Sequence, residues 1–519
     1  DGLISVSITG GNSSYYKNYI WEVLQQQQNC VTYTIRLRDA DNDGIFDIAD
    51  ADLDNDGSTD PGVNDSDKNG VRDEAETVGS GFTYSVIRYQ SCDGTYVTDN
   101  KQSLDDFSLN GSYQICAVPN TVSPDSDFAG FDHDLELVAV VDPNKESSKY
   151  LSDHYLNNTG KKINSFNTLD ELNQSNLSLD SVDITSTNDT HHQISIDAMK
   201  LGLDVMCEKP VALDISLANK VLNYKKKLKR HFALFENFRR DPINRLTKYI
   251  VDSKEFGESL YATDFESSYS FGRVMHGTGW RAKKDKGGGI VLDAGIHNAD
   301  LLIYFLGSIN SVTGSSKILL PERSLISMEE SDHNLKSFYK HRVEEYKNNK
   351  VIQDSVDTIF STIEFNSGAI ASVIISDAIP NLSINESWIY GSRLSLLRTK
   401  SRSGQPIKLI KEGLEITGEK VLEEFPEFKL DYWTQNIFGD FIDGGYSYDF
   451  SEYDRKVIAI EYLDFIKSKL SQEEPEVGII EGINSLSLAY AFIESGFLLK
   501  KIKFDEFIHS QELSYFNDC

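Results

Sequence analysis

Short apolar runs alternate with longer segments of helical periodicity from about residue 130 onward. Residues 135–142 and 181–187 are compact, strand-like runs, and a helical pattern over residues 191–201 leads into another apolar run at 204–207. Strands that alternate with helices at this spacing are typical of a parallel sheet with helices on its faces. We therefore predict an α/β fold with a doubly wound parallel sheet, whose ligands bind at the carboxyl ends of the strands.

Polar residues stand where these predicted strands end. Asp142 closes the first run, where a carboxylate can accept hydrogen bonds from an adenosine ribose and would repel a 2′-phosphate, which favours NAD over NADP. Each such residue also has a simpler interpretation, because an acid can form a turn, an amide can cap a helix and an ammonium can lie on the surface. The polar residues at the next two strand ends are Thr187, Asn188, His191, Glu208 and Lys209.

A triple glycine precedes an acid and a histidine that are four residues apart. Residues 287–289 are all glycine, and Asp293 and His297 follow in a helical pattern. Four residues is about one turn, so the two side chains are predicted to stack on one face of a helix. A carboxylate one turn before an imidazole can orient it and raise its basicity, and such a histidine is a suitable proton acceptor for alcohol oxidation. The pair indicates an enzyme.

The first 130 residues follow a different pattern. Alternating polar and apolar positions at residues 82–87 and 113–118 predict short strands of a small β-rich module. Three of the five cysteines, Cys30, Cys92 and Cys116, fall in this part of the chain. Three cysteines allow at most one internal disulfide, so an oxidising compartment is compatible with the sequence but is not established by it.

Acidic residues are concentrated in the same module. Residues 1–130 contain 22 acidic and 7 basic side chains, in a chain whose net charge is −30. The acids recur in three copies with a period of 13 residues, each with oxygen side chains at alternate positions followed by a glycine. This spacing suits a hard cation with about six to eight oxygen ligands, so we predict structural calcium sites. The predicted ligands are Asp39, Asp41, Asp43, Asp47, Asp52, Asp54, Asp56, Asp60, Asp65, Asp67, Asn69, Asp73 and Glu76.

These copies resemble the tandem aspartate-rich repeats of thrombospondin type 3 and of bacterial surface proteins more than they resemble paired EF-hands. The third copy has Glu76 at the twelfth position of an EF-hand loop, whereas the second has Val63 there. A solvated acidic linker with chance spacing is the alternative, and three in-phase copies favour calcium. A calcium-binding surface, adhesion or scaffold protein is therefore one candidate function for the chain.

Downstream motifs strongly resemble those of the Gfo/Idh/MocA oxidoreductases. The first two are Val-Met-Cys-Glu-Lys-Pro-Val-Ala-Leu at residues 205–213 and Asn-Phe-Arg-Arg-Asp-Pro at residues 237–242. The third is Trp280-Arg281 leading into the triple glycine with Asp293 and His297, and the resemblance spans residues 134–510.

The resemblance implies an NAD(P)-dependent dehydrogenase of sugars, polyols or related small hydroxy or keto compounds. Lys209 and His297 would face the substrate hydroxyl, with Asp293 fixing the imidazole and Lys209 stabilising the developing alkoxide. The cofactor-binding residues that it implies are Asp142, Thr187, Asn188, His191, Glu208, Lys209, Trp280 and Arg281.

The fold implied by the resemblance is a Rossmann-like sheet followed by an α+β domain with an open, mainly antiparallel sheet, through which homo-oligomers often form. We accordingly predict three domains: residues 1–130, residues 131–250, which bind the dinucleotide, and residues 251–519. Residues 357–375 and 406–425 have strand character that matches the open sheet.

The chain departs from the family pattern just before residue 135. Family members carry a first strand and a glycine-rich turn there for the dinucleotide pyrophosphate, whereas residues 119–134 offer only Gly130 and several acids. We therefore predict a Rossmann-like sheet that lacks its first strand. Three interpretations stay open: a chimeric reading frame with an inactive dehydrogenase half, a substitute strand from residues 113–118, or a genuine fusion whose dehydrogenase half only binds ligands.

The charge and hydropathy of the chain exclude two classes of partner. A net charge of −30 argues against nucleic acid and against an anionic membrane, because either would need a basic face. No apolar run is long enough to cross a bilayer. The chain begins at Asp1, which we interpret as an internal or processed position; the dehydrogenase part is expected in the cytoplasm, and the acidic repeats are expected outside the cell or at its surface.

Overall fold

The computed structural model describes residues 136–267, 273–275, 279–326, 350–378 and 383–517, together with the backbone of six earlier strands. The chain separates into two compact units, one of Asp1–Val122 with Ser126–Leu135 and the other of Ser123–Asp125 with Glu136–Cys519. The predicted calcium ligands and residues 119–134 lie outside the described residues, and the three predicted domain boundaries stay predictions.

The described strands of the first unit form two antiparallel sheets of three strands. One has the order β1 (Ser5–Thr9), β4 (Thr83–Gln90) and β5 (Tyr96–Lys101), and the other has the order β2 (Tyr19–Gln27), β3 (Cys30–Leu37) and β6 (Ser112–Cys116). Strands β4 and β6 overlap the two segments in which alternation predicts strands. The register of β3 and β6 places Cys30 opposite Cys116.

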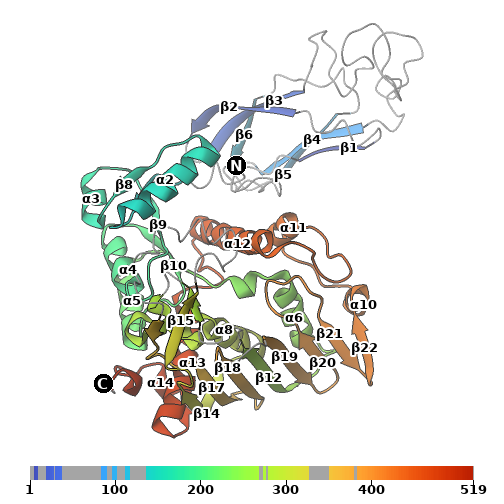
Figure 1. The fold of residues 1–519 in the computed structure, drawn as a ribbon. Helices are drawn as coiled ribbons and strands as arrows, with labels where there is room; N and C mark the ends of the chain where they lie inside the picture. Colours follow the sequence, from blue (N-terminus) through green and yellow to red (C-terminus); the bar gives the residue numbers. More distant parts are fainter. Residues whose placement is uncertain are drawn as a thin grey trace. The chain divides into compact units, whose positions relative to one another are not determined.

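The second unit begins with parallel strands joined by helices, as the sequence predicts. Strand β7 (Ala139–Val141) pairs with β8 (Asn164–Phe166), and β9 (Ser181–Ile184), β10 (Asp204–Glu208) and β11 (Phe232–Phe235) form a second parallel sheet with β10 in the centre. The intervening helices are α2 (Lys145–Thr159), α3 (Leu169–Gln174), α4 (His191–Lys200) and α5 (Ile215–Leu228) (Figure 1). Local capping sets their ends: the Asn144 side chain accepts the first free N–H groups of α2, and Gly160 ends that helix at φ 71°.

The order of these strands matches two parts of a doubly wound sheet. In that topology the first strand lies between the second and the fourth. Strands β7 and β8 correspond to the second and third, and β9, β10 and β11 to the fourth, fifth and sixth. Among the described residues no strand joins β7 to β9. Because residues 119–134 are not described, the predicted loss of the first strand stays a prediction.

A nine-stranded, mainly antiparallel sheet forms the rest of the unit, which confirms that part of the predicted fold. Only the β12–β18 pair is parallel. The order is β22 (Leu414–Thr417), β21 (Lys408–Lys411), β20 (Ser395–Arg398), β19 (Ile384–Gly391), β12 (Ser259–Ser267), β18 (Ile370–Ser376), β17 (Thr358–Phe365), β14 (Ile309–Lys317) and β23 (Ile502–Lys503). A small sheet combines β13 (Arg273–Met275), β15 (Glu322–Ile326) and β16 (Lys350–Ile352).

Helical segments complete the second unit. The α-helices are α6 (Pro242–Asp252), α7 (Ile290–Asp293), α8 (Gly295–Leu306), α10 (Glu419–Glu424), α11 (Tyr432–Phe438), α12 (Phe450–Ser471), α13 (Ile479–Leu498), α14 (Phe504–Phe507) and α15 (Ser514–Asn517). Among the described residues, the 3-10 helices are η4 (Asn237–Arg240), η5 (Gly279–Ala282) and η6 (Lys284–Lys286). Residues 406–425, predicted as strand, therefore contain β21 and β22 and then turn into helix α10.

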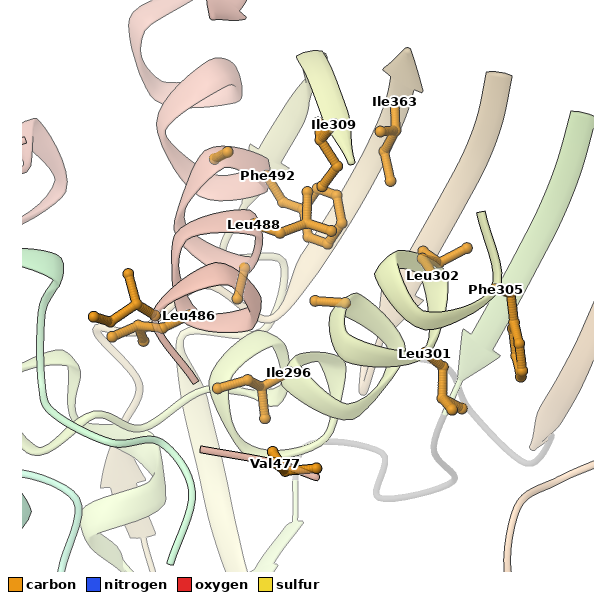
Figure 2. Packing of buried hydrophobic residues seen from close by; sticks show 14 of the residues in the cluster. Ile296, Leu301, Leu302, Phe305, Ile309, Ile363, Val477, Leu486, Leu488 and Phe492 are labelled. Carbon is orange, nitrogen blue, oxygen red and sulfur yellow. The ribbon is translucent and has the colours of Figure 1, made fainter. Parts of the chain in front are cut away.

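Helices α8 and α13 bury one face of the large sheet. Phe492 and Leu488 of α13 pack toward Ile309 and Ile363 of the sheet, next to the apolar residues of α8 (Figure 2). The opposite face is open, because Phe360 is 55% exposed while its neighbour Ile359 is fully buried. Such alternation is expected of an antiparallel strand with one packed and one solvated face. No single helix in the described ranges passes as a membrane span, although the bent pair 284–293 and 295–306 passes when its two parts are taken together.

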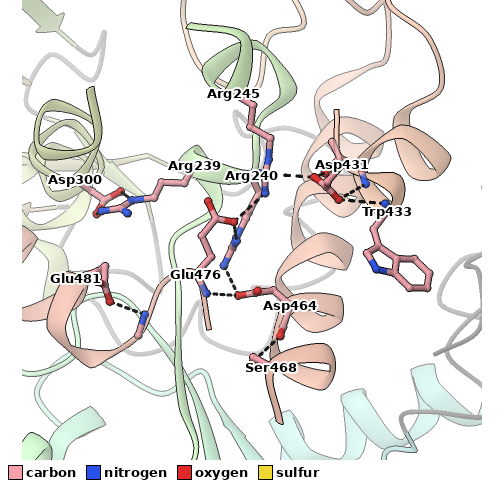
Figure 3. A network of polar contacts seen from close by, with 12 residues as sticks. Arg239, Arg240, Arg245, Asp300, Asp431, Trp433, Asp464, Ser468, Glu476 and Glu481 are labelled. Carbon is pink, nitrogen blue, oxygen red and sulfur yellow. Dashed lines mark hydrogen bonds and ion pairs between the residues drawn. The ribbon is translucent and has the colours of Figure 1, made fainter. Parts of the chain in front are cut away.

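An ionic network holds helix α12 beside η4. The Arg240 guanidinium, 2% exposed, lies between Asp464 and Glu476, and Arg245 donates to the same Glu476 at 2.9 Å (Figure 3). Buried charges of this kind are tolerated only when they are paired. The network thereby fixes the helix that closes one wall of the cavity described next.

Candidate active site

A cavity of about 500 Å³ opens at the carboxyl ends of the parallel strands β9 and β10. Its other walls come from α8, from β12 and β19, from the loop after β20 and from one face of α12. Lys209, Asp293 and His297 all line it, together with Glu208. Lys209 is 84 residues from Asp293 in the chain. Distant segments thus place the predicted catalytic residues around one cavity.

Close backbone packing explains the triple glycine that leads to this site. A Cβ on Gly288 would lie 2.4 Å from the Arg281 carbonyl oxygen, and one on Gly289, whose φ is 97°, would lie 2.8 Å from that of Val356. Any side chain at either position would therefore collide with the backbone. The glycines allow the turn that starts α7.

The helix that carries Asp293 and His297 is broken between them. Helix α7 ends at Asp293 and α8 begins at Gly295, and the helical segments on either side of the break are bent by 54°. The expected stacking of an uninterrupted turn is therefore not maintained.

Asp293 is paired with two cations. Its carboxylate accepts from Arg281 Nε at 2.8 Å and lies 3.5 Å from Lys209 Nζ, while the Lys209 ammonium donates to the Asp293 backbone carbonyl at 2.5 Å. Burial alone would raise its pKa, but Arg281 and Lys209 together hold the pKa of Asp293 well below its usual range. Asp293 is thus a permanent anion that positions Lys209 at the cavity wall.

The imidazole of His297 is held by a different acid from the one that the spacing predicts. Its Nδ1 lies 2.5 Å from Glu236 Oε1, and the Phe238 ring stacks on it with centroids 4.2 Å apart. The expectation that Asp293 orients His297 is corrected by this contact, since the broken helix and the pairing with Lys209 and Arg281 direct Asp293 elsewhere. Sequence reasoning missed Glu236 because it is 61 residues from His297 in the chain. The signal that could have identified it is the position of an acid directly after the buried strand β11.

Several carboxyl groups around the cavity are buried deeply enough to change their ionisation. Burial raises the pKa of Glu236 to about 7 and that of Asp183 to about 6, the latter despite a hydrogen bond from the Tyr462 hydroxyl. Burial also raises the pKa of Glu461, on α12, well above its usual range. The pKa of His297 is lowered well below its ordinary value by burial, and also by Lys209 and Arg402. Burial therefore favours the neutral forms of Glu236, Asp183 and Glu461 and of His297, whereas Asp293 stays ionised.

Three residues predicted to bind the cofactor are not among the residues that line the cavity, and two of them make structural contacts. Asn188 donates to the Gly287 carbonyl at 2.9 Å. His191 is fully buried, with its ring nitrogens 2.8 Å from the Pro210 carbonyl and 3.0 Å from that of Ser186. His191 thus joins the loops that follow β9 and β10, and Asn188 joins the loop after β9 to the triple-glycine turn. These two residues therefore stabilise the loops next to the cavity. Thr187, beside them, also lies outside the cavity wall.

The remaining predicted cofactor residues have local partners. The Asp142 carboxylate accepts a hydrogen bond from the Asn144 N–H at 2.7 Å. This contact is the one expected if the acid forms a turn. Arg281 lies over the Trp280 ring at 4.4 Å and pairs with Asp293. Of the predicted cofactor set, only Glu208 and Lys209 line the cavity itself.

The described residues fit the nicotinamide end of a dinucleotide. Strand ends of a parallel sheet open into the cavity, and three of its buried acceptor oxygens, Asn237 Oδ1, Asn298 Oδ1 and Glu461 Oε1, have no hydrogen-bond partner. A ligand that offers donors would satisfy them. For the pyrophosphate, no Gly-x-Gly-x-x-Gly sequence follows a strand within the described ranges of the second unit.

Two family models match consecutive parts of the chain. The oxidoreductase family model with an NAD-binding Rossmann fold matches residues 125–235, and the GFO/IDH/MocA C-terminal domain model matches residues 245–397.

Curated proteins and a solved structure are also similar to this chain. The chain is 29% identical over 188 residues to D-glucoside 3-dehydrogenase of Escherichia coli K12, covering 36% of this chain and 51% of that protein. It is 26% identical over 129 residues to 1,5-anhydro-D-fructose reductase of Ensifer adhaerens, covering 25% of this chain and 38% of the relative. The chain thus spans about half or less of the length of these curated relatives. An NAD-binding oxidoreductase from Klebsiella pneumoniae has the same fold, with a TM-score of 0.56 at 18% identity over 71% of this chain and 90% of that one.

Both halves of the family's architecture are therefore matched in order along the chain by two family models, and a solved structure shares the fold. The chain belongs to the Gfo/Idh/MocA family of oxidoreductases.

Proposed function

We propose that the second unit is an NAD-dependent oxidoreductase that interconverts a hydroxyl and a carbonyl group of a sugar, a polyol or a related small molecule. The observation that carries this proposal is the placement of Lys209 and His297 in the wall of one cavity. The names of the relatives, a D-glucoside 3-dehydrogenase and a 1,5-anhydro-D-fructose reductase, support a sugar as substrate. Asp142, half-buried at the end of β7, supports NAD over NADP.

The side chains divide the work as follows in this proposal. His297 takes the proton from the substrate hydroxyl, or returns it in the reverse direction. Lys209, which Asp293 holds in place, donates a hydrogen bond to the same substrate oxygen as negative charge develops on it. The nicotinamide cofactor, when bound, exchanges a hydride with the substrate carbon. The protein contributes alignment of the reactants and exclusion of water.

Cofactor binding and turnover test this proposal on the full chain. We expect NADH fluorescence to change on binding and a panel of sugars and polyols to include at least one compound that is oxidised. His297→Ala should abolish turnover and leave the circular dichroism spectrum intact, whereas His509→Ala, at an exposed position, should keep wild-type rates. No NADH binding and no turnover with any sugar would refute the proposal and favour a protein that only binds or scaffolds.

We also propose that copies of the chain associate through the open face of the large sheet. An apolar, aromatic surface crosses β19 and β12 there, where Tyr390 stacks on Tyr261 with centroids 4.1 Å apart and on Trp388 at 5.8 Å. Phe360, on β17, extends this surface at 55% exposure. Contiguous exposed apolar surface favours a protein partner. Sedimentation should give an oligomer for the wild-type chain and a monomer for Tyr261→Glu, and an unchanged oligomer in that variant would contradict the proposal.

For the first unit we propose that the repeats at residues 39–76 bind calcium. The proposal is supported by the three in-phase copies of the oxygen-ligand pattern in the sequence. Calorimetric titration of the full chain with calcium should show saturable heats, and calcium should raise the unfolding temperature of the first unit. Flat heats would remove the proposal, and binding without NADH affinity would favour the calcium-dependent adhesion or scaffold function.

A further inference from the structure

A buried carboxyl group contacts Nδ1 of His297, which leaves Nε2 as the other nitrogen of a ring that lines the cavity. Glu236, at the end of β11, is 1% exposed and His297 is 7% exposed. Glu236 Oε1 lies 2.5 Å from Nδ1 and also accepts from the Phe238 N–H at 3.3 Å, while its Oε2 has no hydrogen-bond partner. The stacked Phe238 ring keeps the imidazole in the plane of this contact.

The chemistry of the two groups links the proton of Glu236 to the behaviour of the far nitrogen. A neutral imidazole has one N–H. When the carboxylate is ionised, Nδ1 carries that hydrogen and donates to Oε1, so Nε2 has a free lone pair. When the carboxyl group is protonated, it donates to Nδ1, so the hydrogen of the imidazole must be on Nε2. One proton therefore decides whether Nε2 accepts or donates.

We propose that Glu236 is a positioning residue that sets the direction in which His297 moves a proton, by exchanging one proton with its Nδ1. With Glu236 ionised, Nε2 accepts a proton from a substrate hydroxyl; with Glu236 protonated, Nε2 donates one to a substrate carbonyl. This inference rests on the proposed function and deepens it. It assigns to Glu236 the role that the sequence spacing predicted for Asp293.

The proton transfers balance in both directions. During oxidation the substrate O–H bond breaks and an Nε2–H bond forms, while the Nδ1–H bond breaks and an Oε1–H bond forms. A bound nicotinamide cofactor would supply the acceptor for the hydrogen and electron pair of the substrate C–H bond. The Glu236–His297 pair starts with one proton and ends with two, and solvent must remove one before the next oxidation. Reduction runs these steps in reverse.

The surroundings of the pair favour a neutral imidazole and allow the carboxyl group to change its protonation. Burial lowers the pKa of the His297 imidazole, and the positive charges of Lys209, after β10, and Arg402, in the loop after β20, lower it further. The negative charges of Glu208 and Asp293 raise this pKa. Burial raises the pKa of Glu236 to about 7, and Lys209, Arg239 and Arg402 limit this rise. An imidazolium is therefore disfavoured, and the carboxyl group changes its protonation near neutral pH.

Nitrogen NMR of histidine-labelled chain, free of cofactor, tests the exchange directly. We assign His297 by its loss in His297→Asn. Between pH 5.5 and 8.5 the wild-type ring should change from the Nε2–H to the Nδ1–H tautomer, and Glu236→Gln should remove this pH dependence. Glu494→Gln is the matched control, because Glu494 is also a buried glutamate but accepts a hydrogen bond from the Tyr515 N–H outside the cavity. This variant should keep the wild-type pH dependence of the His297 tautomer.

Kinetics provide the second readout. The oxidation rate of the wild type should rise about tenfold across this pH range while the reduction rate falls, because the two directions need opposite states of Glu236. Glu236→Gln should flatten both profiles, and Glu236→Asp should restore a pH dependence. A single tautomer of wild-type His297 at every pH, or an unchanged titration in Glu236→Gln, would overturn the inference even if the chain is active. Absence of all turnover together with the expected tautomer change would instead refute the proposed function and leave the proton exchange standing.

Discussion

Replacement of Lys209 by methionine tests the central electrostatic interaction of the proposed reaction. The side chain is 15% exposed, and its ammonium lies 2.5 Å from the Asp293 carbonyl oxygen and 3.5 Å from the Asp293 carboxylate. Methionine has nearly the same length without the charge, so the cavity wall should stay filled. Asp293 keeps its hydrogen bond from Arg281, and the fold should therefore tolerate the change.

The expected loss follows from the distance at which the ammonium can act. At an effective dielectric constant of about 20, unit charges about 3 Å apart attract by about 5 kcal/mol, which is an upper bound for the effect on a complete alkoxide. Only part of that charge exists in the transition state, and removal of one oxyanion donor costs about 3–4 kcal/mol in measured cases. We therefore expect Lys209→Met to lower kcat by about 100- to 1,000-fold, with KM changed by less than about threefold.

Initial rates of sugar oxidation, with NADH formation followed by absorbance, measure this loss. Lys286→Met is the matched control, because Lys286 forms an exposed pair with Asp189 at 2.7 Å, and its kcat should stay within about twofold of wild type. A loss of less than tenfold in Lys209→Met, with its NADH affinity and unfolding temperature intact, would show that the ammonium does not act on the reacting oxygen.

Three further predictions concern stability and reactivity. Arg240→Met should lower the free energy of unfolding of the second unit by about 3 kcal/mol, because Asp464 and Glu476 lose a buried partner. Urea denaturation measures this free energy, and a loss below about 1 kcal/mol would contradict the importance of the network in Figure 3. Phe492→Ala should cost about 3–5 kcal/mol in the same assay, since the ring is fully buried, and a near-neutral effect would contradict the packing in Figure 2. Burial raises the pKa of the Cys207 thiol, so alkylation at pH 8, followed by mass spectrometry of its peptide, should be slow until the protein is unfolded; rapid labelling of the native protein would disagree with this burial.

Local patterns in the sequence were sufficient for much of the fold. Alternating apolar runs and helical segments identified the parallel strands β9 and β10 and helix α4, because neighbouring positions in a strand or helix share a face and so carry their burial pattern in the sequence. The mainly antiparallel sheet came from the family resemblance, and residues 357–375 indeed form β17 and β18. The strand prediction for residues 406–425 extended too far, since the segment 419–424 is helical.

The sequence by itself determined which residues could do the chemistry: Lys209 and His297 stood out by their types and motifs, and both line the cavity. Tertiary structure alone decided their partners. Spacing along a regular helix predicted that Asp293 would orient His297, but the helix breaks at residue 294, and Lys209 and Arg281 pair with Asp293. Glu236 reaches His297 from 61 residues away. A hydrogen bond depends on distances in space, and a chain that folds back on itself sets those distances through packing between distant segments, which no local periodicity records.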